Sequence, residues 1–208
     1  MSDGQSEQAP APEGVPAVGE VLAGKYRVER VLGVGGMGAV VAAMHLQLGE
    51  RVALKFLLPS MATDETIERF AREARAAARI KSEHIARVTD VGTLETGAPY
   101  MVMEFLEGSD LSAVLKEQGP PPVRDAVEYV IQAADAVAEA HAIGIVHRDL
   151  KPANLFLARR PGAPARVKVL DFGISKVVAP DEQQGPLEQR TVTRTRAWLG
   201  SPLYMAPE

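Results

Sequence analysis

Two short segments of this 208-residue chain restrict its possible folds more than any other feature. Residues 147–154 read His-Arg-Asp-Leu-Lys-Pro-Ala-Asn, and residues 171–173 read Asp-Phe-Gly. Together they supply a carboxylate, a lysine, an asparagine and a second carboxylate in close succession. Such a set can orient a hydroxyl, neutralise a phosphate and offer oxygen ligands to a hard metal ion. For either segment alone, the alternative is an ordinary polar turn with a helix-capping aspartate.

Two earlier segments fit the same chemistry. Residues 33–40 read Gly-Val-Gly-Gly-Met-Gly-Ala-Val, and glycines let backbone N–H groups approach a triphosphate closely. The position between two expected strands disfavours a dinucleotide-binding turn, although a flexible hairpin turn fits a lone match equally well.

Lys55 lies in an apolar strand, where an unpaired ammonium is costly. Glu73, close to the apolar stripe of the next expected helix, is the candidate partner. The alternatives are a lysine that protects an edge strand and a glutamate exposed on a helix.

These segments resemble the glycine-rich loop, strand lysine, catalytic loop and magnesium-binding motif of protein kinases. Residues 200–208 (Gly-Ser-Pro-Leu-Tyr-Met-Ala-Pro-Glu) are similar to the segment that closes the kinase activation loop. The resemblance covers about residues 24–208 and implies an α+β, two-lobed protein-kinase-like fold, with a β-rich N-lobe and an incomplete helical C-lobe. We expect a disordered tail at 1–19, the N-lobe and hinge at 20–106 and the partial C-lobe at 107–208.

The resemblance also implies ATP and Mg²⁺ as cofactors and a set of site residues. Asp149 is the expected catalytic base, Lys151 is expected to neutralise the transferring γ-phosphoryl, and Lys55, held by Glu73, to contact the α- and β-phosphates. Asn154 and Asp171 are the expected metal ligands. The expected nucleotide-binding residues are Leu32, Gly33, Gly35, Gly36, Gly38, Val40, Ala53, Lys55, Met103, Glu104, Leu106, Asp110 and Phe156. In isolation, Met103 and Phe156 would more often be plain core residues.

Regulation and partners follow from the same resemblance. Lys151 accompanies serine/threonine specificity, and the motifs look most like those of bacterial members. Thr193 and Thr195 alternate with arginines and are expected autophosphorylation sites, because a phosphate opposite an arginine gains charge-assisted hydrogen bonds. A polar loop is the alternative. The expected partners are protein substrates with Ser or Thr acceptors, and a second copy of the chain for autophosphorylation in trans.

Hydrophobic periodicity predicts strands and helices along the chain. The strands are expected at 26–32, 38–44, 50–58, 85–92, 99–105, 155–157 and 167–170, and the helices at 64–81 and 123–142. Kinase domains continue beyond the motif at Glu208, so the resemblance implies that helix 123–142 exposes an apolar face here.

Composition excludes several classes of protein. The absence of cysteine excludes disulfides and zinc–thiolate sites, and the net charge of −4 argues against a nucleic-acid-binding surface. Without a membrane-length apolar run or a signal pattern, the expected location is the cytoplasm. The alternative function is an ATP-binding but catalytically incompetent interaction module. A small-molecule phosphotransferase is disfavoured, because such enzymes are not expected to show the ordered motif set of this chain.

Overall fold

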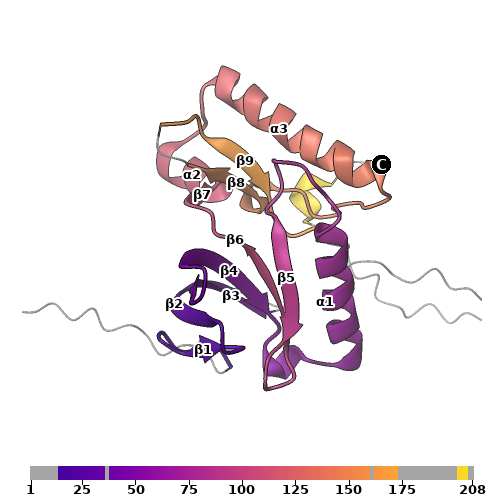
Figure 1. Ribbon diagram of the computed structural model, residues 1–208. Helices are drawn as coiled ribbons and strands as arrows, with labels where there is room; N and C mark the ends of the chain where they lie inside the picture. Colours follow the sequence, from indigo (N-terminus) through magenta and orange to yellow (C-terminus); the bar gives the residue numbers. More distant parts are fainter. Residues whose placement is uncertain (1–13, 36–37, 160–161, 173–200, 206–208) are drawn as a thin grey trace, which may run out of the picture. The chain divides into compact units, whose positions relative to one another are not determined.

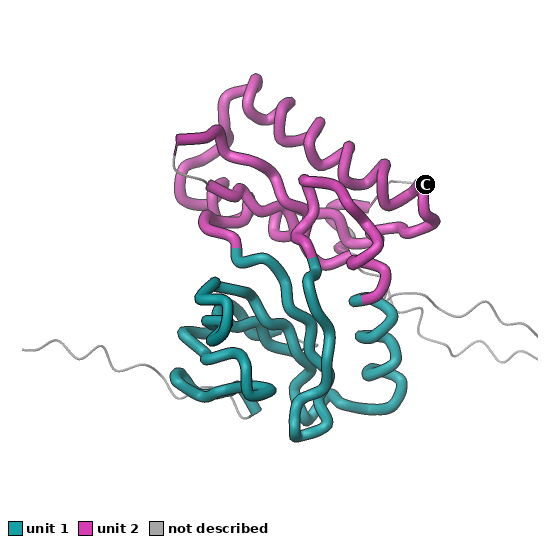
Figure 2. Tube along the Cα trace, viewed as in Figure 1, with its two compact units in different colours: residues 1–74, 88–105 teal, residues 75–87, 106–208 magenta. Residues whose placement is uncertain are grey.

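The computed structural model describes residues 14–35, 38–159, 162–172 and 201–205 (Figure 1). The chain divides into two compact units, with residues 1–74 and 88–105 in unit 1 and residues 75–87 and 106–208 in unit 2 (Figure 2). Unit 1 is rich in strands and unit 2 contains most of the helical residues, which confirms the α+β prediction. Among the described residues, no helix combines the length and the apolar character needed to cross a bilayer.

Unit 1 is built on a six-stranded antiparallel sheet in the order β1-β2-β3-β4-β6-β5. Val41, Leu54 and Val102 are register partners across three adjacent strands and are fully buried in one core cluster. The alternation of apolar and polar residues therefore fixes which face of the sheet is buried. The strands are β1 (Val21–Leu22), β2 (Tyr26–Gly35), β3 (Gly38–His45), β4 (Glu50–Phe56), β5 (Val88–Thr93) and β6 (Pro99–Glu104).

The opposite face of the sheet carries helix α1 (Asp64–Ala77). Phe70 and Ala74 of this helix form a buried cluster with Leu57 and Met101 of the sheet side. The helix stops at Ala77, four residues before the predicted end at 81, and the chain that follows belongs to unit 2. Residues 75–87, which the sequence analysis places in the N-lobe, are grouped with unit 2, where Ile80 and Ile85 pack into the core. The boundary between the lobes stays a prediction.

The start of the chain departs from the predicted disordered tail at residues 14–19. Val15 is only 9% exposed and belongs to the main core cluster of unit 1. The backbone N–H of Gly19 donates to the carbonyl of Val28 at 2.8 Å, and the N–H of Val28 donates to the carbonyl of Glu20 at 2.9 Å. One apolar side chain and a short ladder thus order a segment whose average composition predicts disorder. Residues 1–13 lie outside the described residues.

The stability of this core depends on pH through the ionisation of Tyr26. Its ring is 2% exposed, and its hydroxyl lies 3.4 Å from Oδ2 of Asp90. Burial, followed by the nearby Asp90 charge, raises the pKa of Tyr26 to about 12. Burial also raises the pKa of Tyr100.

Alkaline pH is therefore expected to destabilise the protein. Between about pH 10 and pH 12 the unfolded chain loses a phenol proton that the folded chain keeps, so the free energy of unfolding falls as pH rises. The expected loss is about 2 kcal/mol, measured by urea unfolding at several pH values. Tyr26→Phe should show a shallower loss, with the remainder due to Tyr100. An unchanged slope in this variant would contradict the assignment.

Unit 2 combines a small sheet with two helices. The sheet order is β7-β8-β9, with β7 (Gly108–Asp110), β8 (Leu155–Ala158) and β9 (Arg166–Val169). Helices α2 (Leu111–Gln118) and α3 (Val123–Ala142) complete the unit, with short 3-10 helices at Pro152–Asn154 and Pro202–Tyr204. The predicted helix 123–142 and the strand pair are confirmed, whereas β1, β7 and α2 were not predicted.

Helix α3 packs on β9 through its alanines. Ala133, Ala136 and Ala140 are buried in the same cluster as Val167 and Val169. The larger apolar residues of the helix are exposed instead: Val123, Val127, Val130 and Ile131. The apolar face expected on this helix is therefore present in the structure.

Candidate functional site

The side chain of Asp149 is the centre of a polar cluster in unit 2. Lys151 Nζ lies 2.9 Å from Asp149 Oδ2, and the Ser201 hydroxyl donates to Asp149 Oδ1 at 2.9 Å. Lys151 Nζ also lies 3.0 Å from Ser201 Oγ. A carboxylate, an ammonium and a hydroxyl thus form a closed triangle of hydrogen bonds. The sequence analysis does not predict the direct contact of Lys151 with both groups.

His147 holds the loop that carries Asp149. Its ring is 3% exposed and lies 4.9 Å from the Phe172 ring, centroid to centroid. Nδ1 accepts the backbone N–H of Asp149 at 3.3 Å, so the proton is assigned to Nε2, which donates to the carbonyl of Leu170 at 2.8 Å. The imidazole therefore connects the first motif to the second and has a structural role.

Two non-glycine residues in these segments have left-handed backbone. The φ angles are 62° at Arg148 and 48° at Asp171. Such conformations are uncommon for side-chain-bearing residues and persist where the surrounding structure enforces them. Here they occur beside Asp149 and at the second carboxylate of the predicted site.

Asn154 is brought close to the start of the second motif. The backbone N–H of Leu170 donates to the carbonyl of Asn154 at 2.9 Å, one residue before Asp171. The side-chain amide of Asn154 donates to the Asp149 carbonyl at 2.7 Å. Its Oδ1 atom accepts no hydrogen bond from the described residues, so an oxygen ligand remains for a cation. An amide oxygen and a carboxylate fit the ligand preference of Mg²⁺.

In unit 1, Lys55 and Glu73 form the predicted contact. Lys55 Nζ lies 3.4 Å from Glu73 Oε1, and the two side chains are 16% and 10% exposed. Lys55 lies two residues before Leu57, which directly follows β4 and packs against Phe70 and Ala74 of α1. By contrast, Glu68 pairs with Arg72 on the solvent side of the helix. The nucleotide-binding role of the pair stays a prediction.

Breaking the pair from one side is expected to destabilise the protein. Lys55→Met leaves the Glu73 carboxylate in a mostly buried position without this cation, which should lower the free energy of unfolding by about 2 kcal/mol. Adding Glu73→Leu should recover most of the loss, because no buried charge then remains. Urea unfolding of the two single variants and the double variant measures this coupling.

The exposed pair of the same helix serves as the control. Arg72 and Glu68 are 53% and 71% exposed, so Glu68→Gln should cost less than about 0.5 kcal/mol. Additive effects of Lys55→Met and Glu73→Leu would show that the contact contributes no coupling energy.

Several predicted nucleotide-binding residues share one face of the unit 1 sheet. Val40 is the register partner of Lys55, and Ala53 is the partner of Met103. Gly33 pairs with Val40 across the hairpin. A Cβ atom on Gly33 or Gly35 would meet nothing within 4 Å, whereas one on Gly38 would lie 2.1 Å from the carbonyl oxygen of Phe56. Gly38 is therefore required by the fold, and the other two leave open space beside the strand.

The other predicted binding residues are spread over both units. Leu32 and Glu104 lie in unit 1, at the exposed end of β2 and the end of β6, whereas Leu106, Asp110 and Phe156 lie in unit 2. A single pocket formed by all of them stays a prediction. The predicted residues Gly36, Thr193 and Thr195 lie outside the described residues.

Asp110 has a role that the sequence analysis missed. Its Oδ1 accepts the backbone N–H of Ala113 at 3.0 Å and caps helix α2. Asp110 also pairs with Phe156 across β7 and β8. The cap leaves Oδ2 without a hydrogen bond from the described residues, so a ribose contact remains compatible with this geometry.

Comparisons with known proteins show the family of this chain. A family model described as the protein kinase domain matches residues 26–208. The serine/threonine-protein kinase pkn3 of Myxococcus xanthus is 42% identical over 192 residues, covering 92% of this chain and 34% of that protein. PknA of Mycobacterium tuberculosis is 39% identical over 198 residues, covering 93% of this chain and 43% of that protein.

The solved structures agree as well. The crystal structure of the Mycobacterium tuberculosis PknI kinase domain superposes with a TM-score of 0.65 at 36% identity, covering 77% of this chain and 62% of that chain. The chain therefore belongs to the protein kinase family, and the predicted kinase-like fold is confirmed. It spans between about a third and two fifths of the length of the two curated relatives above.

Proposed function

We propose that this chain carries the catalytic site of a serine/threonine protein kinase, which transfers the γ-phosphoryl group of ATP to Ser or Thr hydroxyls of proteins. The hydrogen bond from Ser201 Oγ to Asp149 Oδ1, at 2.9 Å, is the observation that carries the proposal. A serine hydroxyl donating to this carboxylate has the arrangement that a substrate hydroxyl needs before it attacks phosphorus.

Each side chain of the cluster has a role in this proposal. Asp149 orients the attacking hydroxyl and accepts its proton, and Lys151, which reaches the same carboxylate, neutralises the phosphoryl group in transfer. In unit 1, Lys55 binds the α- and β-phosphates while Glu73 keeps its ammonium in position. His147 keeps the loop in register through its bonds to Asp149 and Leu170.

Asn154 and Asp171 would hold Mg²⁺, because their oxygen atoms suit a hard cation. When bound, the ion supplies positive charge that offsets the charge of the phosphates. The chain's own contribution is to hold the Asn154 side chain through the hydrogen bond from its amide N–H to the Asp149 carbonyl. This bond leaves the Oδ1 atom of Asn154 for a cation.

The proposal extends to regulation and partners. The substrates are proteins with Ser or Thr acceptors. Thr193 and Thr195 accept the γ-phosphoryl group of ATP in a reaction that a second copy of the chain catalyses. The named function of the bacterial relatives supports the substrate class, since pkn3 and PknA are both serine/threonine-protein kinases. A cytoplasmic location is part of the same proposal.

Phosphoamino-acid analysis tests the acceptor class. Casein is incubated with the chain, radiolabelled ATP and Mg²⁺, and then hydrolysed. The expected label is on phosphoserine and phosphothreonine, with none on phosphotyrosine, and EDTA should remove it. Label on tyrosine would contradict the serine/threonine assignment.

A further inference from the structure

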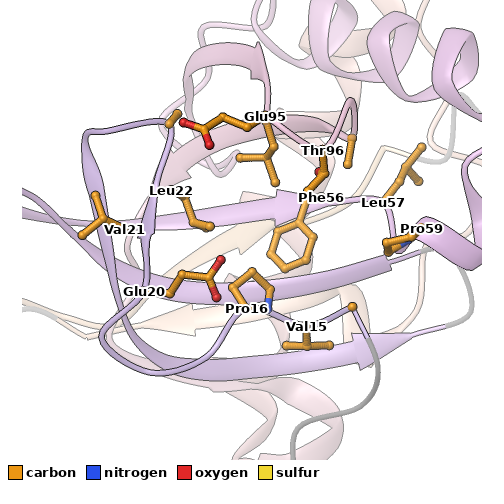
Figure 3. A pocket seen from close by; sticks show the side chains of 14 residues that line it. Val15, Pro16, Glu20, Val21, Leu22, Phe56, Leu57, Pro59, Glu95 and Thr96 are labelled. Carbon is orange, nitrogen blue, oxygen red and sulfur yellow. The ribbon is translucent and has the colours of Figure 1, made fainter.

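A hollow in unit 1 lies away from all the residues assigned above. Its volume is about 290 Å³, and it is formed by residues 14–23, the end of β4 with Pro59, and the turn between β5 and β6 (Figure 3). Leu22, Phe56, Leu57 and Ala98 are buried apolar residues at its lining. Pro16 and Leu94 are partly buried and Val21 is exposed, so the lining also offers an accessible apolar surface, beside the exposed polar side chains of Glu20, Glu95 and Thr96.

The wall formed by residues 14–23 is held firmly to the sheet. Val15 is part of the core, and the bonds of Gly19 and Glu20 with Val28 extend the ladder of β2. Gly14 has a φ angle of 84°, and a Cβ atom there would lie 2.6 Å from Cδ of Pro59. The hollow is thus a built feature of unit 1 and is bordered on one side by well-packed backbone.

Two glutamates lie among the side chains that surround the hollow. Glu20 and Glu95 are both exposed, and neither forms an ion pair with any described residue (Figure 3). Glu20 Oε2 accepts the backbone N–H of Ala17 at 2.9 Å, which fixes the carboxylate and leaves Oε1 for a further partner. An apolar lining next to two uncompensated carboxylates is complementary to an apolar group flanked by positive charge.

The size and openness of the hollow decide which kind of occupant fits. Small-molecule sites usually have volumes of roughly 300–1,000 Å³ and enclose most of their ligand. This hollow is at the lower limit, and Val21, Glu95 and Thr96 at its lining are exposed, so an isolated small ligand would stay largely in solvent. A single large side chain on a protein segment gains its affinity from the neighbouring residues as well, as interface anchors do.

We propose that this hollow is a docking site for a protein segment in which a large apolar side chain is flanked by basic residues. The apolar side chain packs against Pro16, Val21 and Leu94, the accessible apolar residues of the lining, and the basic groups pair with Glu20 and Glu95. The chain's own first residues are a poor occupant, because residues 1–13 contain Asp3, Glu7 and Glu13 and no Lys or Arg. Docking here requires neither nucleotide nor phosphoryl transfer.

Isothermal titration calorimetry with a synthetic peptide tests the proposal on the 208-residue chain without nucleotide. The probe is Gly-Arg-Phe-Arg-Gly, capped at both ends, and the controls replace Phe by Ala or both Arg by Glu. Burial of the Phe ring should make the probe bind about tenfold more tightly than the Ala peptide. The Glu peptide should show no binding, because it brings like charges to the two glutamates.

Variants of the chain locate the site. Glu20→Gln with Glu95→Gln should weaken binding about fivefold, because two partly screened ion pairs are lost. Glu50→Gln with Glu68→Gln, which removes the same two charges at exposed positions elsewhere in unit 1, should leave the affinity unchanged. Equal weakening by this control variant would show general charge attraction and overturn the proposal. An absence of binding, or equal affinity for the Phe and Ala peptides, would overturn it too.

Discussion

Asp149→Asn is expected to lower phosphoryl transfer about 10³-fold, the scale of effect for a lost general base. The amide accepts a hydrogen bond from a substrate hydroxyl but cannot take its proton. In the unmodified chain, Ser201 Oγ and Lys151 Nζ each lie 2.9 Å from one carboxylate oxygen of Asp149. The local structure should survive, because an asparagine keeps one of these two acceptors. The rate of phosphate incorporation into casein, measured beside the unmodified chain, checks this expectation.

Nucleotide affinity is the control for this variant. Asp149 lies in the cluster with Lys151 and Ser201, whereas Lys55 and Glu73 belong to unit 1. Binding of a fluorescent ATP analogue should therefore change less than about threefold, because no phosphate-binding cation is removed. A transfer rate unchanged in Asp149→Asn would contradict the assignment of the base.

Gly108→Ala is expected to lower the free energy of unfolding by about 4 kcal/mol, among the largest effects of a single methyl group. Gly108 has a φ angle of 139°, where a side chain is strained, and an added Cβ atom would lie 2.0 Å from the carbonyl oxygen of Leu157. The residue pairs with Ala158 in the β7–β8 ladder, so relief of the clash requires separation of the strands. Thermal unfolding should show a fall in Tm of about 10 °C.

Gly119→Ala separates the cost of the strained backbone from the cost of the contact with a neighbouring strand. Gly119 ends helix α2 with a φ angle of 75°, but a Cβ atom there would meet nothing within 4 Å. Only the backbone conformation is penalised, and a φ of 75° with a ψ of −170° lies in a region that essentially only glycine adopts, so the expected cost is about 2 kcal/mol. Equal destabilisation by the two substitutions would show that the contact with Leu157 is unimportant.

The parts of the fold that could be predicted are those in which a strong local pattern agrees with the tertiary structure. The alternation in β4 placed Lys55 on a face that also carries Leu57, and the cost of an isolated buried ammonium required a partner. Glu73 was the one acid close to the apolar stripe of the next helix, and the structure brings the two together. Here the alternation of the strand and the electrostatic cost of an isolated ammonium both predict that Lys55 pairs with Glu73.

Helix α3 is an element whose position could be predicted from the sequence but whose buried face could not. Helical spacing identifies the element, but the helix has two apolar stripes, one of alanines and one of larger residues. The structure buries Ala133, Ala136 and Ala140, because small side chains let the helix approach β9 closely, and it exposes Val130 and Ile131. The choice between the stripes depends on the surface that the helix packs against, which local periodicity does not contain.

The missed elements are short and depend on their neighbours. Strand β1 has 2 residues and exists through its pairing with β2. Helix α2 has 8 residues, and its signals were visible in Asp110 at the start and Gly119 at the end. The sequence analysis names Asp110 only as a nucleotide-binding residue, although its place before an apolar segment also suits a helix cap.

The contacts around Asp149 depend on long-range packing. Ser201 is 52 positions away along the chain, and His147 is fixed by a carbonyl 23 positions away. Motif spacing predicted which residues have the right chemistry, but only the fold shows that Lys151 contacts both Asp149 and Ser201.

Intact-mass spectrometry of the 208-residue chain, before and after incubation with Mg-ATP and beside Asp149→Asn, tests the central claim most directly. Each phosphate on a hydroxyl adds about 80 Da. We expect successive additions in the unmodified chain and none in the variant. If folded chain that binds ATP gains no mass, the site described here is not a working kinase site in this polypeptide.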